Sequence, residues 1–142
     1  PMIHMIKLCV GVSSFEELES YRHERAHWWD ADYGEDVHVH RTRMMPKRAA
    51  EMEGQASIYW VIAGQVCCRQ PILRLVPYVD GEGKSYCDII LAPELIRTIP
   101  YPKRPFQGWR YLTPADAPPD LGANENAGSL ELAADLARLG LI

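Results

Sequence analysis

Residues 57–91 read SIYWVIAGQVCCRQPILRLVPYVDGEGKSYCDIIL. This stretch contains three apolar runs rich in β-branched and aromatic residues, a composition typical of strands. Gly64-Gln65 predicts a tight turn after the first run, and Asp80–Gly83 predicts a hairpin loop after the second. Pro71 cannot donate a ladder hydrogen bond, so it predicts a bulge, a bend or a sheet edge. Three hairpin-connected strands therefore form the centre of the predicted fold.

The segment before residue 57 predicts two further strands, Met2–Val12 and Val37–Met45, with helices after each. Ser13 and Ser14, followed by Glu16 and Glu17, form a capping-box pattern that predicts a helix from there to about Trp29. The apolar face of that helix is interrupted by Arg22. Pro46 predicts the start of a short helix over residues 47–53, which Gly54 would end.

The segment after residue 91 is richer in proline. We expect one helical turn at Pro93–Arg97, an ordered loop from Thr98 to Gly122, a flexible link over residues 123–128 and a helix over residues 129–140. Residues 1–142 are predicted to be a single domain with a barrel-like core over residues 1–122. The expected class is α+β: a curved antiparallel sheet or small β-barrel, with an N-terminal helix and a C-terminal helix.

Composition restricts the class of protein. The chain has 142 residues, 47% of them hydrophobic, which predicts a folded core rather than disorder. No apolar run reaches membrane-spanning length, and residues 1–12 are better explained as a strand than as a signal peptide. The four cysteines form no Cys-x-x-Cys pair, so we expect reduced thiols and a cytoplasmic location.

Charge is unevenly distributed along the chain. The net charge is −4, but residues 41–110 carry +5 and the remaining residues carry −9. Such asymmetry is typical of proteins with an anionic partner. The alternative is that the two parts neutralise one another across the fold.

Cations and aromatic rings concentrate in the run Lys103–Tyr111 (KRPFQGWRY). Side chains of these two kinds can hold an anion and a flat ring together. A second basic set lies at the end of the strand predicted over 37–45 and just beyond it. The candidate ligand-binding residues are Arg41, Arg43, Lys47, Arg48, Arg104, Gln107, Trp109, Arg110 and Tyr111. Trp109 and Tyr111 would stack a base, and the first four cations would hold phosphate. The alternative explanation is a solvated surface with ordinary salt bridges and buried core aromatics.

Five segments carry a resemblance: residues 40–43 (HRTR), 46–48 (PKR), 59–64 (YWVIAG), 69–72 (RQPI) and 106–112 (FQGWRYL). With these the chain resembles an uncharacterised alphaproteobacterial family that carries only a domain-of-unknown-function label. The order of the elements is more distantly similar to PUA-like domains, including the ASCH and EVE branches. That resemblance implies a small bacterial barrel whose groove binds RNA or a modified base, and it assigns no individual residue.

Binding of RNA, a nucleotide or a modified nucleobase is thus the predicted function, and it requires neither catalytic residue, metal nor cofactor. One alternative is a small metal-assisted or acid–base enzyme that uses His38 or His40. His23 and His27 also have a spacing that suits metal ligation. A second alternative is a protein-interaction module or homodimer formed through the C-terminal helix, whose apolar stripe is Leu132, Leu136 and Leu139.

Overall fold

The computed structural model describes residues 1–34, 36–122 and 138–139. The helical elements are α1 (Phe15–Glu24), α2 (Asp30–Tyr33) and the 3₁₀ turn η1 (Ala49–Glu51). The strands are β1 (His4–Leu8), β2 (His38–Thr42), β3 (Ser57–Ile62), β4 (Gln65–Val79), β5 (Ser85–Leu91), β6 (Ile96–Pro102) and β7 (Trp109–Leu112). The three central hairpin-connected strands are confirmed as β3, β4 and β5.

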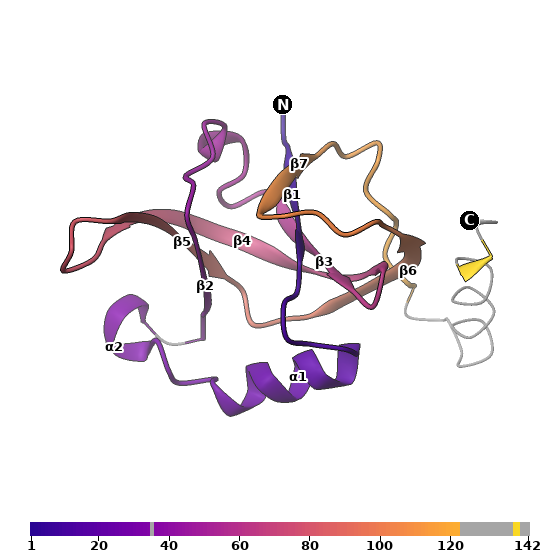
Figure 1. Cartoon of the computed structure of the whole chain (residues 1–142), viewed down its shortest axis with the longest axis horizontal. Coiled ribbons are helices and arrows are strands. Elements are labelled where there is room, and N and C mark those ends of the chain that lie inside the picture. Colours follow the sequence, from indigo (N-terminus) through magenta and orange to yellow (C-terminus); the bar gives the residue numbers. More distant parts are fainter. Residues whose placement is uncertain (35, 123–137, 140–142) are drawn as a thin grey trace.

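The seven strands form one mixed sheet in the order β2-β5-β4-β3-β1-β7, with β6 paired to β4 (Figure 1). Most pairs are antiparallel, but β1 runs parallel to β3, because the chain crosses over through α1 and β2 between them. The expected α+β class agrees broadly with this arrangement, but the sheet is mixed rather than antiparallel. In the described ranges the two end strands, β2 and β7, do not pair with one another, so the curved sheet is open rather than a closed barrel (Figure 1).

The curvature of the sheet depends on β4, which changes partner halfway. Its first half pairs with β3 up to Pro71, and its second half pairs with β5 from Ile72 onward. The register shifts between Ile72 and Arg74, which confirms the irregularity predicted from Pro71. Proline leaves no donor for a continuous ladder, so a change of partner is tolerated there.

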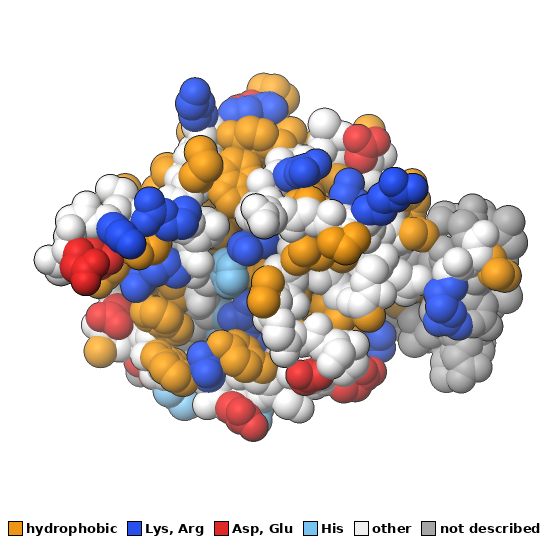
Figure 2. Space-filling model, viewed as in Figure 1, with side chains coloured by type: hydrophobic (Ala, Val, Ile, Leu, Met, Phe, Trp, Pro, Cys, Tyr) orange, Lys and Arg blue, Asp and Glu red, His pale blue; other side chains and the backbone are white. Residues whose placement is uncertain are grey.

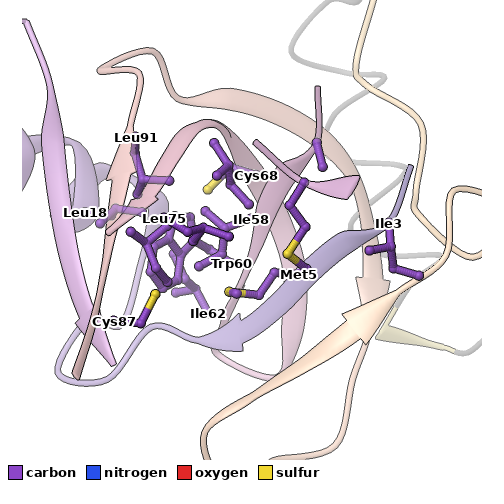
Figure 3. Close-up of a cluster of buried hydrophobic side chains, with 14 of the residues drawn as sticks. Ile3, Met5, Leu18, Ile58, Trp60, Ile62, Cys68, Leu75, Cys87 and Leu91 are labelled. Atoms are coloured by element: carbon purple, nitrogen blue, oxygen red, sulfur yellow. The ribbon is translucent and has the colours of Figure 1, made fainter. Parts of the chain in front are cut away.

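The hydrophobic core fills the concave side of the curved sheet (Figure 3). Alternate residues of β3 point into it, namely Ile58, Trp60 and Ile62, as expected from the two-residue period of a strand. Helix α1 covers part of this side with Phe15 and Leu18. Ser14 caps the helix by accepting a hydrogen bond from the Glu17 N–H, which confirms the predicted N-cap. The Glu17 carboxylate accepts from the Ser13 N–H and hydroxyl rather than from the Ser14 N–H of a regular capping box.

Three sequence-based expectations about local structure are corrected. Helix α1 ends at Glu24 rather than near Trp29, because the chain loosens there into turns hydrogen-bonded to the third residue back, such as Trp28 N to Arg25 O. The helix expected over 47–53 is only the single 3₁₀ turn η1. The helical turn expected at Pro93–Arg97 is absent from the described structure, since β6 begins at Ile96.

The proline-rich segment Thr98–Gly122 is not a continuous loop, because it contains most of β6 and all of β7. β6 accepts Pro100 because that residue lies where the β4–β6 register shifts, and Pro102 because it is the last residue of the strand. The other edge of β6 forms an antiparallel bridge between Thr98 and Asp120. The predicted link over 123–128 and nearly all of the predicted helix over 129–140 lie outside the described residues. None of the helices in the described part of the chain is both long and apolar enough to cross a membrane.

A buried carboxylate joins β2, β5 and α2. Asp88 on β5 is fully buried and accepts hydrogen bonds from Arg41 Nε at 2.6 Å and Arg41 Nη2 at 2.9 Å. The Tyr33 hydroxyl of α2 donates to the same carboxylate. Burial raises the pKa of Asp88, but the hydrogen bonds from Arg41 and Tyr33 outweigh burial and leave the pKa below its usual range.

Asp88→Asn is expected to lower the free energy of unfolding by about 3 kcal/mol, because it leaves the Arg41 guanidinium without its buried counter-charge. Urea unfolding followed by circular dichroism measures this. Asp116→Asn, an exposed carboxylate between β7 and the end of the described segment, is the matched control and should change stability by less than about 0.5 kcal/mol. A loss that small for Asp88→Asn as well would contradict the role assigned to this carboxylate.

Candidate functional site

A cavity of about 450 Å³ opens between α1, β1, β2 and β3, where the curved sheet is not closed by strand pairing. Figure 2 shows a hollow on this face, with histidine at its visible floor and Lys or Arg side chains beside it. No Asp or Glu lines the cavity in the described part of the chain. The lining residues are Lys7, Cys9, Val10, Gly11, Val12, Leu18, Tyr21, Arg22, Arg25, Trp29, His38, Val39, His40, Arg41 and Trp60.

The inner wall of the cavity is Trp60, which a buried polar network holds in one orientation. The Trp60 indole N–H donates to Gln70 Oε1 at 3.0 Å, so the Gln70 amide nitrogen must be the atom that faces His38 and Ala92. That nitrogen donates to the Ala92 carbonyl at 3.0 Å and to His38 Nδ1 at 3.2 Å. The His38 ring therefore carries its proton on Nε2. Trp60, Gln70 and His38 form a rigid backing for the site.

Two cations enter the cavity from different elements. Arg22 of α1 is only 8% exposed, and its guanidinium carbon lies 5.6 Å from the centre of a Trp60 ring. Lys7 of β1 lies beside Trp60 of β3 in the strand register, on the same face of the sheet. Burial lowers the pKa of both Lys7 and Arg22, the expected effect of removing a cation from water. Among the described residues neither cation has an ion-pair partner.

Two buried nitrogen atoms at the cavity have no hydrogen-bond partner within the described structure: Arg22 Nε and His40 Nε2. The His40 ring packs edge-on against Trp60, with ring centres 5.1 Å apart. Burial, together with the charges of Lys7 and Arg22, lowers the pKa of His40 to about 3. Burial and the charge of Arg22 lower the pKa of His38 to about 4. Both imidazoles are therefore neutral near pH 7.

The chemistry of this arrangement favours an anionic, planar ligand. Buried polar atoms usually have partners, and an unpartnered guanidinium Nε–H can be satisfied only by an acceptor atom. The positive charges of Lys7, Arg22 and Arg25 would attract a phosphate or carboxylate, since the lining supplies no opposing charge. Tyr21, Trp29 and Trp60 offer aromatic surface for a flat ring. The cavity volume lies within the range of small-molecule sites.

The candidate residues predicted from the sequence lie in different parts of the structure and differ in whether their charges are paired. Arg41 lines the cavity, but its charge is neutralised by Asp88 and its guanidinium stacks on Tyr78 at 3.7 Å. Arg48 is paired with Glu51 through two hydrogen bonds of 2.6 and 2.8 Å. The others on this part of the chain, Arg43 and Lys47, are exposed and form no ion pair with any described residue.

Trp109 and Tyr111 connect the two unpaired ends of the sheet. The Trp109 indole N–H donates to the Met44 carbonyl at 3.0 Å, and the Tyr111 hydroxyl accepts from the Arg48 N–H at 3.2 Å. The two rings pack edge to face at 5.0 Å, and Trp109 also packs against the core. These contacts join β7 to the segment that follows β2. Trp109 is thus partly buried and held in place by contacts within the fold.

The rest of the Lys103–Tyr111 run lies apart from Trp109. Arg110 pairs with Ile6 in the β1–β7 register, so it points to the convex face, and its guanidinium lies 5.0 Å from the Phe106 ring centre. Arg104 and Gln107 are exposed in the segment before β7. A smaller hollow of about 280 Å³ on that face is lined in part by Lys103, Arg110 and Asp116.

The cavity residues Lys7 and Arg22 were not among the candidates predicted from the sequence. Two signals could have indicated them: Arg22 interrupts the apolar face of an amphipathic helix, and Lys7 interrupts an apolar strand. A long cation on a buried face is rare unless it has a partner. The sequence did not show that the two positions meet, because α1 and β1 come together only through packing.

The histidine pairs considered for metal ligation do not form a metal site in the described ranges. No three His, Cys, Asp or Glu side chains lie there in positions that could hold a metal ion. His27 instead contacts the Asp30 carboxylate at 3.0 Å within the same turn. The four cysteines are free thiols.

These features define a mostly β domain with an open mixed sheet and a cationic, aromatic cavity at its unpaired edge. Residues 5–142 match the model of the DUF1489 family, described as a protein of unknown function, and the chain belongs to that family. No curated protein and no solved structure matches it. The family assignment agrees with the domain-of-unknown-function resemblance of the sequence.

Stability is expected to fall as the pH is lowered from 6.5 toward 4. The unfolded histidines bind protons near pH 6.5, whereas folded His38 and His40 bind them only near pH 4 and 3, so protonation favours unfolding in this range. Each of the two histidines can lower the free energy of unfolding by up to about 1.4 kcal/mol for each pH unit below 6.5. Urea unfolding at pH 7 and pH 5 measures this loss, and His40→Gln should reduce it. The exposed His23→Gln serves as control; equal stability of the wild type at both pH values would contradict the buried neutral histidines.

Trp109→Phe is expected to lower the free energy of unfolding by about 1 to 2 kcal/mol, because it removes the hydrogen bond to Met44 and part of the buried ring. Trp28→Phe, at a 59% exposed position without such a bond, is the matched control and should have almost no effect. Thermal unfolding measures both. Equal stability of the two variants would show that Trp109 does not join the sheet ends.

Proposed function

We propose that this protein binds a nucleotide or a nucleobase carrying a phosphate, in the cavity between α1, β1, β2 and β3. The observation that carries the proposal is Arg22, a buried cation held against Trp60. Within the described residues its Nε–H has no partner and the cavity lining contains no carboxylate. A buried guanidinium without a counter-charge is costly, and an anionic ligand would relieve that cost. The ligand class is the one predicted from the sequence, whereas the proposed site shares only Arg41 with the candidate residues predicted there.

The proposal assigns separate tasks to the groups of the cavity. Lys7, Arg22 and Arg25 attract the phosphate, and Arg22 also donates its Nε–H to an acceptor oxygen of the ligand. His40 Nε2 offers one further polar contact, as a donor or an acceptor according to its tautomer. Trp29 and Tyr21 supply apolar surface for the ring.

Two further observations support this ligand class. The PUA-like resemblance of the sequence implies binding of RNA or a modified base, as a fold-level analogy. In addition, Lys and Arg side chains occur around the hollow in Figure 2. Two exposed cations that follow β2, Arg43 and Lys47, would extend such a positive surface from the end of the strand that lines the cavity. No catalytic step is proposed, since the depressed pKa values of His38 and His40 make both imidazoles weak bases near neutral pH.

Lys7→Met is expected to weaken binding of a 5′-mononucleotide about 10-fold and to reduce the dependence of affinity on salt, because it removes one phosphate contact. Titration calorimetry with AMP, GMP, CMP and UMP at 50 and 200 mM salt measures this. The matched control is Lys84→Met, at an exposed position in the β4–β5 loop, which should leave affinity unchanged. Wild-type protein that binds none of the four, or that binds with equal affinity after Lys7→Met, would contradict the proposed site.

A further inference from the structure

The mouth of the cavity continues into an exposed aromatic ladder at the end of α1. Tyr21, Arg25 and Trp28 follow one another at spacings of four and three residues, and the Arg25 guanidinium carbon lies 4.1 Å from both ring centres. We infer that the ligand is single-stranded nucleic acid: one nucleotide occupies the cavity and the adjoining base stacks on Trp28. This inference rests on the proposed function and deepens it.

Trp28 is the outermost side chain of the ladder. It is 59% exposed, although one side of its ring is covered by Arg25, so the ring presents open apolar surface to solvent. Exposed aromatic rings beside cations are the stacking platforms of proteins that bind single strands without regard to sequence. A lone exposed aromatic needs no explanation, but this one is held in place by a stacked guanidinium.

The ladder is continuous with the cavity, and this favours a nucleic-acid strand over a free mononucleotide as the ligand. Tyr21 and Arg25 line the cavity as well as forming the ladder, whereas Trp28 lies one step further out. A free mononucleotide would fill only the cavity and would leave Trp28 unused. In a strand, the phosphate between the first and second nucleotides would lie near the Arg25 guanidinium, which can bind it while remaining stacked.

The charges around the ladder predict how the second nucleotide is held. Helix α1 carries the carboxylates Glu16, Glu17, Glu19 and Glu24, so this side of the site does not attract phosphate in general. All four are exposed, and Glu17 accepts a hydrogen bond from the Ser13 hydroxyl. The contribution of Trp28 should therefore come from stacking, which depends little on salt, whereas the contribution of the cavity cations should fall as salt rises.

The test compares a mononucleotide with a six-nucleotide single strand, as RNA and as DNA of mixed sequence, by titration calorimetry at 50 and 200 mM salt. The wild type should bind the six-mer about 5- to 150-fold more tightly than the mononucleotide, the gain typical of one stacked base. Trp28→Ala should lose most of that gain in affinity, and the loss should be similar at both salt concentrations. The affinity of the variant for the mononucleotide should stay within about twofold of the wild-type value. Tyr101→Ala, at another exposed aromatic, on β6, is the matched control and should keep the gain.

Three results would overturn the inference: no tighter binding of the six-mer, a gain that survives Trp28→Ala, or a gain that is lost in Tyr101→Ala instead. Each leaves the proposed function standing if the mononucleotide still binds and Lys7→Met weakens it. Absence of mononucleotide binding overturns the proposed function itself. Equal gains with RNA and DNA would show that stacking alone selects the ligand, and a gain with only one of them would show that the sugar is also recognised.

Discussion

The packing around the Trp60 indole is the interaction on which the candidate site depends. Its N–H fixes the Gln70 amide, and that amide in turn fixes the His38 ring. Arg22 lies over a ring of the same indole, and His40 meets it edge-on. One buried side chain of a central strand thus positions groups from α1, β2 and β4. Because interiors are close-packed, none of these groups can move without displacing another, so the cavity is preorganised rather than assembled by the ligand.

The open edge of the sheet explains why a cavity exists at this place. β2 and β7 are not paired with one another, and the contacts of Trp109 and Tyr111 with the segment after β2 close only one part of the gap. Pairing along the whole edge would have filled the space with backbone and core side chains. The gap instead exposes the concave side of the sheet, where the side chains of β1 and β2 that would face a closed core include Lys7 and His40. The open sheet therefore leaves a polar site on its otherwise apolar concave side.

Sequence reasoning predicted the parts of this fold that local chemistry determines. The hairpins at Gly64 and Asp80, the irregularity near Pro71 and the cap at Ser14 all follow from one or two residues. It failed where a tertiary contact decides the outcome. The parallel pairing of β1 with β3 and the strand at β7 require partners distant in the chain. The cations of the Lys103–Tyr111 run were conspicuous because they are adjacent in sequence, whereas Lys7, Arg22 and His40 come together only in the folded protein.

The most direct test of the account is the side-chain signal of Arg22 Nε–H in nitrogen-15 NMR spectra, recorded while a mononucleotide is added. Arg22→Lys assigns the signal, because it removes the Nε–H and keeps the charge. The account predicts that this signal shifts and exchanges more slowly with solvent, together with shifts at Lys7 and His40, as the ligand accepts the unsatisfied hydrogen bond. Shifts confined to residues 103–111, with the Arg22 signal unchanged at saturation, would contradict it and would place the ligand on the convex side of β7.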